Sequence, residues 1–293
     1  MYGGWGTSAP EWAVVVEPPL GRAPSSAPQQ KDPAPPTRWV ALAAGLLLGV
    51  TLIGTGFVVR RAVWPANAAI ADLRPGPVRG VPGESYAVTW ISAAGTPVRW
   101  NPCRAIRWVA NPAGAPPGAI EEAKAAFGRL SKASGLRFDF LGSTDEPPSA
   151  DRAGVQARYG DDWAPLLLAW APLKGTALGA GLGTGVETVG VATPVAIIER
   201  DSAVIVTAQV VLETARPLVA GFGTSESRGS VVLHELAHAL GLGHVPDPSQ
   251  LMAGSGASAG GPGELQAGDL AGLAALGAAG GCLDEPDPAK GRT

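Results

Sequence analysis

The stretch HELAHALGLGH, from His234 to His244, contains all three histidines of this 293-residue chain. His234 and His238 are four residues apart, so on an α-helix they stand one turn apart on the same face. The largely apolar run before them, residues 230–233, favours a buried amphipathic helix. Two neutral imidazoles on one helix face can both reach a single metal ion, at about 2.0–2.1 Å each for zinc.

The end of the same stretch supplies a third ligand. Gly241 follows His238 by three residues, and glycine commonly ends helices because it adopts a left-handed backbone at little cost. A sharp turn at Gly241 would bring His244 to the same metal. Three protein ligands leave a fourth position for water, which is typical of a catalytic zinc site rather than a structural one. We therefore predict a metal site formed by His234, His238 and His244.

Glu235 stands next to the first histidine, one residue further round the helix. From there it would not bind the metal itself, but it could reach a metal-bound water and act as a general base. A short H-E-x-x-H pattern can also arise by chance on a surface helix. The longer pattern H-E-x-x-H-x-x-G-x-x-H fixes a third ligand and a glycine with a mechanical role, and it favours a true zinc site.

The extended motif resembles that of the metzincin clan of zinc endopeptidases, and the residues after His244 are most similar to the matrixins, the matrix-metalloproteinase family. Asp247-Pro248 and then Met252 match the matrixin layout. The resemblance implies that Met252 forms a floor under the zinc without binding it. Residues 263–277 are similar to the last matrixin helix, and Asp269 falls where that family has an aspartate supporting the methionine turn. One catalytic Zn²⁺ and a peptide or protein substrate are implied.

The sequence also departs from the matrixin pattern. The prodomain segment with its switch cysteine is absent, and no histidine remains for a second, structural zinc. Residue 268 is glycine where many matrixins have a second aspartate that receives a freed N-terminus. No acidic loop of EF-hand type is present, which argues against inherited calcium binding, and the calcium requirement is left undecided.

The fold class expected is α/β (α+β), in the style of a metzincin-like zincin catalytic domain. It would have a twisted mixed sheet, an early helix, the zinc helix at the cleft and a C-terminal helix. The early helix is predicted around residues 119–130, where apolar residues recur at helical spacing. Strands are predicted at residues 86–91, 106–110, 165–170, 190–198 and 203–214, with a glycine-rich loop at residues 181–190.

The N-terminal part of the chain has a different composition. Residues 1–38 are rich in proline and alanine, and we expect them to be disordered. Residues 39–59 carry no charge and would form a helix ~31 Å long, close to the ~30 Å of a hydrocarbon core, so they predict a transmembrane helix. A cleaved signal peptide is the alternative. Residues 60–84 resemble a linker, residues 85–283 a protease domain and residues 284–293 a flexible tail.

The predicted helix implies a single-pass protein of the cell membrane. Flanking positive charges lean slightly towards an internal C-terminus, but the cysteines argue for an external domain, so we expect the protease domain to be extracellular. Cys103 and Cys282 could form a disulfide between the start and the end of the domain, remain buried thiols, or in the case of Cys103 block the zinc. The net charge of −3 gives no basic patch, so we expect no nucleic-acid partner.

The sequence thus favours a zinc-dependent endopeptidase. One alternative is a catalytically silent, zinc-stabilised surface module that binds a wall or protein partner, and another is a zinc hydrolase of a non-peptide substrate. The presence of Glu235 argues against the silent module, because metal binding alone does not require a base.

Overall fold

The computed structural model describes residues 58–59, 73–179, 188–199, 202–254 and 261–291. The predicted disordered tail lies outside these residues, as does the predicted transmembrane helix except for its last two residues. Those two, Val58–Val59, form the short strand β1. Within the described ranges, no helix is both long and apolar enough to cross a bilayer.

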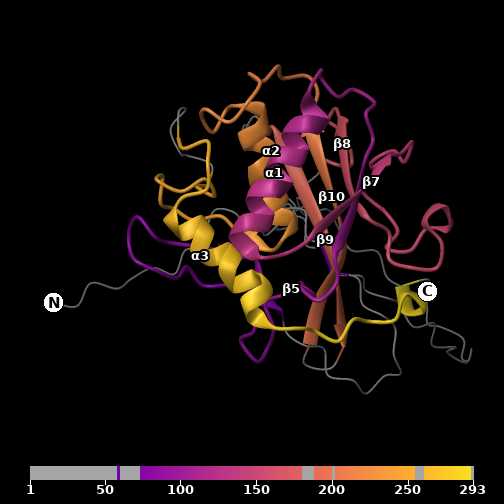
Figure 1. Ribbon diagram of the computed structural model, residues 1–293, viewed down its shortest axis with the longest axis vertical. Coiled ribbons are helices and arrows are strands. Elements are labelled where there is room, and N and C mark those ends of the chain that lie inside the picture. The colour runs from indigo at the N-terminus through magenta and orange to yellow at the C-terminus, as the bar shows by residue number, and fades with distance from the viewer. Residues whose placement is uncertain (1–57, 60–72, 180–187, 200–201, 255–260, 292–293) are drawn as a thin grey trace, which may run out of the picture.

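The centre of the domain is a seven-stranded mixed sheet (Figure 1). Its order is β1-β9-β10-β8-β6-β7, and β5 pairs with β10. The β9–β10 hairpin is antiparallel and every other pairing is parallel, so a mixed sheet is confirmed. Besides β1, the strands of this sheet are β5 (Arg99–Trp100), β6 (Ile106–Ala110), β7 (Phe138–Ser143), β8 (Leu166–Ala171), β9 (Gly190–Glu199) and β10 (Ser202–Glu213).

Three helices lie on one side of this sheet: α1 (Ala119–Ser134), α2 (Arg228–Ala239) and α3 (Ala267–Leu276) (Figure 1). α2 packs against α1 and against β9 and β10, while α1 also packs against α3. The apolar stripe of α1 is buried as its spacing predicted, and it contributes Ala119, Ala123, Ala126, Phe127 and Leu130 to the main core.

A bulge in β10 decides which of its side chains reach the helices. The register of β10 against β9 shifts between Ile205 and Thr207. Before the shift, Ala203 and Ile205 join the main core, and after it Ala208, Val210 and Leu212 do so. An extra residue in a strand inverts the alternation of faces, so both halves of β10 bury apolar side chains under the helices.

The opposite face of the sheet is covered by irregular chain and the 3₁₀ turn η1 (Ala157–Tyr159). Small apolar clusters form there around Leu167, Trp163 and Leu173. β8 is therefore buried on both faces, as its continuous apolar run predicted. The same side holds an ion pair in which Arg152 Nε donates to Glu146 Oε1 at 2.8 Å, with both side chains 5% exposed.

The entry to the domain forms two short ladders outside the main sheet. β2 (Arg74–Pro75) pairs with β4 (Trp90–Ile91), and β3 (Ala87–Val88) pairs with β11 (Leu242–Gly243), both antiparallel. The strand expected at residues 86–91 is thus divided between two partners. Part of the predicted linker, from residue 74 onwards, joins the folded domain because its backbone finds a partner in β4.

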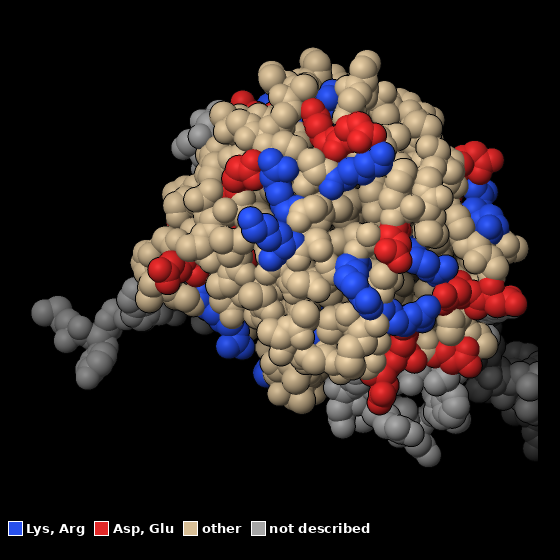
Figure 2. Space-filling view, viewed as in Figure 1, with Lys and Arg blue, Asp and Glu red and all other residues tan. Residues whose placement is uncertain are grey.

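A disulfide joins Cys103 to Cys282. The chain after α3 forms the 3₁₀ turns η2 (Ala278–Gly280) and η3 (Pro288–Gly291). In the stretch between these two turns, Pro286 O accepts a hydrogen bond from Trp163 Nε1 at 3.0 Å. Part of the stretch expected to be a flexible tail therefore contacts the domain. Arg104 forms ion pairs with Asp162 and Glu285, and Figure 2 shows basic and acidic side chains side by side on the visible face.

Candidate metal centre

Helix α2 presents the first two histidines. It begins after Ser227, whose hydroxyl accepts hydrogen bonds from the N–H groups of Gly223 and Thr224 in the preceding loop. Almost every residue of α2 is buried, because one side meets α1 and another meets the sheet. His234 and His238 therefore lie on a helix whose position is fixed by packing on two sides.

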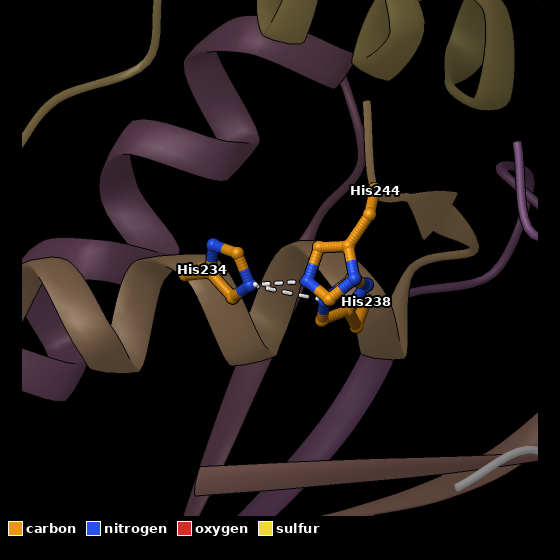
Figure 3. Close-up of side chains that lie close together, drawn as sticks. All are labelled: His234, His238 and His244. Atoms are coloured by element: carbon orange, nitrogen blue, oxygen red, sulfur yellow. Dashed lines mark hydrogen bonds between the residues drawn. The ribbon is translucent and has the colours of Figure 1, made fainter. Parts of the chain in front are cut away.

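The three histidine side chains converge on one point (Figure 3). The Nε2 atom of His238 lies 3.0 Å from Nε2 of both His234 and His244, and the last pair is 3.1 Å apart. Gly241 makes this possible: its φ of 103° reverses the chain after α2 and returns His244 to the helix. The structure thus brings together the three residues that the sequence predicted as ligands.

The hydrogen bonds of two rings define their tautomers. Nδ1 of His234 lies 2.8 Å from Leu251 O, and Nδ1 of His238 lies 2.7 Å from Leu242 O. A carbonyl oxygen can only accept, so each Nδ1 carries the hydrogen and donates it. In the neutral ring Nε2 then has a lone pair and no hydrogen. Lone pairs that face one another at this distance repel, unless a cation lies between them.

Burial keeps these imidazoles neutral. It lowers the pKa of His234, although the hydrogen bond to Leu251 opposes the shift. Burial, followed by the charges of the other two histidines, lowers the pKa of His238 well below its ordinary value. Burial and the charge of His234 lower the pKa of His244 to about 3. All three rings are therefore unprotonated at neutral pH, which is the form that binds metals.

The donor set fits a zinc ion. Neutral imidazole nitrogens suit zinc and several other transition metals, and zinc in hydrolytic sites takes three protein ligands and leaves one position open. His238 is buried, whereas His234 and His244 are partly exposed, so solvent can approach the cluster from the side of these two rings. Carbonyl oxygens that accept from Nδ1 are typical outer-shell partners of metal-binding histidines.

Glu235 is buried beside the cluster, at 7% exposure. Burial raises the pKa of its carboxyl to about 8. The side chain lies against the first residue of β9: a Cβ atom placed on Gly190 would come within 2.6 Å of Glu235 Cγ and 2.9 Å of Oε1. The side chain of Glu235, the predicted base, thus lies between α2 and the start of β9, and the absence of a side chain at Gly190 leaves room for it.

The loop after His244 is held by Asp269. This carboxylate accepts hydrogen bonds from the N–H groups of Leu251 at 2.8 Å, Met252 at 3.2 Å and Gln266 at 2.8 Å. Burial raises its pKa, and these three hydrogen bonds oppose the shift. Met252 is buried at 1% exposure within the main core. Asp269 thus fixes the main chain at Leu251 and Met252 through hydrogen bonds.

Other residues that shape the site were not singled out in the sequence. The carbonyls of Leu242 and Leu251 orient two histidines, yet main-chain groups leave no trace in side-chain patterns. Gly190 contacts Glu235, which is 45 positions further along the chain. Gln250 contacts Gly268, which is 18 positions further along. Gln250 follows Asp247 and Ser249 in a polar stretch, so its residue type gave no signal of a buried role.

No protein-family model matches this chain, and no curated protein matches it. Among solved structures, the chain is similar to metalloproteinase-II from Bacteroides fragilis, with 16% sequence identity and a TM-score of 0.35. The match covers 62% of this chain and 57% of that chain, so it spans little more than half of the other protein. A likeness at this level carries no conclusion about activity.

Proposed function

We propose that this protein is a zinc-dependent endopeptidase. The observation that carries the proposal is the cluster of three Nε2 atoms, 3.0–3.1 Å apart, of which two are held by their Nδ1 hydrogen bonds with lone pairs turned inwards. A cation bound between these atoms would relieve the repulsion between their lone pairs. The adjacent Glu235 supplies the one group that hydrolysis needs in addition to the metal.

The roles of the residues follow from their chemistry. His234, His238 and His244 would hold the zinc, which when bound supplies a Lewis acid that makes water more acidic and polarises a carbonyl. The Glu235 carboxylate would take a proton from the attacking water and deliver it to the leaving amine. A cation nearby favours the charged form of Glu235, which offsets the effect of its burial on the pKa.

The position of β9 supports an extended peptide as the substrate. β9 lies next to the end of the main sheet, and among the residues that the structure describes its outer side pairs with β1 at Val195 and Ala196 alone. The strand starts at Gly190, against Glu235. An extended peptide that adds to this edge would form main-chain hydrogen bonds and place a peptide bond close to the base. We infer that residues 190–194 provide that edge.

Several finer features belong to the same proposal. The matrixin-like subtype rests on Asp247-Pro248, Met252 and Asp269. Membrane anchoring through residues 39–59 rests on their sequence alone, and an extracellular domain rests on the Cys103–Cys282 disulfide, since such bonds persist in oxidising compartments. Labelling of intact cells with a membrane-impermeant reagent would test the orientation: an unlabelled domain would contradict it.

The decisive experiment measures zinc content and cleavage of a peptide pool by the purified full chain. We expect about one zinc per chain and cleavage that a chelator abolishes. Glu235→Gln should keep the zinc and lose the cleavage, while Glu121→Gln, at an exposed position on α1, should keep both. Cleavage that survives in Glu235→Gln would refute the mechanism, and a chain without zinc would refute the function. Zinc binding without any cleavage would favour the silent module.

A further inference from the structure

Gln250 uses both ends of its amide group while being almost fully buried, at 1% exposure. Its Oε1 atom accepts hydrogen bonds from Gly268 N at 2.8 Å and Asp269 N at 3.3 Å, in the first turn of α3. Its Nε2 atom donates to Gly83 O at 2.8 Å and to Ser249 Oγ at 3.0 Å. One side chain thus links the entry to the domain with the start of its last helix.

The contact with Gly83 is reinforced by Asp247. Its Oδ2 atom accepts hydrogen bonds from Gly83 N at 2.7 Å and from Ser85 Oγ at 3.2 Å, and Oδ1 accepts from Ser249 N and Oγ. The main-chain N–H and C=O of Gly83 are therefore both bound to the loop after His244, through two different side chains. Residues 83–85, which we call the entry segment, are pinned to this loop.

The loop in turn orients a ligand. Gln250 directly precedes Leu251, whose carbonyl accepts from Nδ1 of His234 and whose N–H donates to Asp269. Asp269 therefore accepts a hydrogen bond from Leu251 N and donates one from its own N–H to Gln250 Oε1. Gln250 is thus linked through Asp269 and through the chain itself to the carbonyl that orients the ring of His234.

The packing leaves no free space at this junction. A Cβ atom on Gly268 would lie 2.1 Å from Ser85 O and 2.7 Å from Gln250 Oε1. The entry segment, Gln250 and the first turn of α3 are in direct contact only because residue 268 has no side chain. The next residues of the chain form β3, which pairs with β11 next to the carbonyl of Leu242 that orients His238.

We propose that Gln250 is a positioning residue that couples the entry segment to the metal site, so that metal affinity depends on the contact between Gln250 and Gly83. The inference rests on the proposed function in that it takes the histidine cluster to bind zinc. It goes further by assigning control of that binding to a residue that touches neither the metal nor a histidine side chain.

Gln209 offers a matched control on the other side of the domain. It is a glutamine of similar burial, at 2% exposure, and its amide bridges in the same way: Oε1 accepts from Ser149 N and Nε2 donates to Ser149 O. Gln250→Met and Gln209→Met each remove a buried bridging amide and keep the shape of the side chain. Only the first change lies next to a group that orients a histidine.

The test measures zinc affinity of the full chain by competition with a chromogenic chelator, together with thermal unfolding of the zinc-free forms. We expect Gln250→Met to weaken zinc binding about tenfold or more, in the range found when outer-shell partners are removed. Gln209→Met should lower the unfolding temperature by a similar amount and leave zinc affinity unchanged. Equal zinc affinity in Gln250→Met and wild type would overturn the proposal, as would an equal loss in Gln209→Met.

A conservative variant changes the donor end of the Gln250 side chain, which contacts Gly83 O and Ser249 Oγ. Gln250→Glu keeps an acceptor for the N–H groups of Gly268 and Asp269 but turns an oxygen towards Gly83 O. We expect it to weaken zinc binding as well, and it carries the test if Gln250→Met does not fold. Wild-type affinity in Gln250→Glu would overturn the role of the contact with Gly83. A wild-type chain that binds no zinc would overturn the proposed function, whereas the variant results overturn only the positioning role.

Discussion

Removing the disulfide should destabilise this domain more than any single hydrogen bond could. The bond joins residues 179 positions apart, Cys103 and Cys282. On the chain-entropy model, closing a loop of that length stabilises the folded state by about 5 kcal/mol, because it restricts the unfolded chain. The total free energy of unfolding of a single domain is about 5–15 kcal/mol. The double change Cys103→Ser with Cys282→Ser is thus predicted to cost a large share of the stability.

The structure indicates that the disulfide acts by restricting the unfolded chain, and that other contacts maintain the folded state. A guanidinium nitrogen of Arg99 donates to Gly280 O at 2.6 Å and Gly281 O at 2.9 Å, and Asn101 Oδ1 accepts from Leu283 N at 3.2 Å. These hydrogen bonds hold the end of the domain in place without the covalent bond. The folded state should therefore keep its arrangement, and zinc affinity should stay at the wild-type value.

Urea unfolding followed by tryptophan fluorescence would measure the effect. We expect the free energy of unfolding to fall by about 5 kcal/mol and the dependence on urea to become steeper, because the uncrosslinked unfolded chain exposes more surface. Arg99→Met should cost more in the cysteine-free chain than in wild type, since it then removes the remaining attachment. A loss below about 1 kcal/mol with an unchanged urea dependence would refute the reasoning.

Three further predictions concern other parts of the domain. Asp269→Ala leaves three N–H groups without a partner, two of them buried and that of Gln266 partly buried, so urea unfolding should show a loss of about 3 kcal/mol. A loss well below this would contradict the assigned contacts. Gly190→Ala pushes the Glu235 carboxyl aside and should lower kcat/KM by about 10²-fold with zinc retained; unchanged kinetics would place the base elsewhere. Burial raises the pKa of Glu146, but the charge and hydrogen bond of Arg152, together with hydrogen bonds from Gln156 and Tyr159, outweigh it, and the net pKa is lowered from 4.5. The ion pair of Glu146 with Arg152 therefore stabilises the fold above about pH 4.5 and loses its contribution as the pH falls through the lower pKa of the folded state. Glu146→Gln should flatten the decline of the urea midpoint below about pH 4.5. A decline as steep as in wild type would exclude this ion pair as its source.

The histidine cluster was predictable because its determinants are local. Helical periodicity places His234 and His238 on one face, and Gly241 returns His244 within six residues, so no long-range pairing has to be known. The main strands were predictable for a similar reason. The runs that became β6, β8 and β10 are rich in apolar and β-branched residues over lengths typical of strands.

The surroundings of the site depend on contacts between distant parts of the chain. Gly83 meets Asp247 across 164 positions, and no pattern in residues 60–84 distinguishes a docked segment from a linker. The bulge after Ile205 depends on how two neighbouring strands register, which a single strand sequence does not encode. The same holds for Arg152, which finds Glu146 only once the chain has covered the far face of the sheet.

The two acceptors that orient the rings of His234 and His238 are main-chain carbonyls, and this makes the site tolerant of mutation. Every residue type carries the same carbonyl, so replacing Leu242 or Leu251 changes the core packing without deleting the acceptor for His238 or His234. Loss of ring orientation requires a movement of the backbone itself. Sequence drift at these two leucines can therefore alter the stability of the domain while leaving the tautomers of its histidines unchanged.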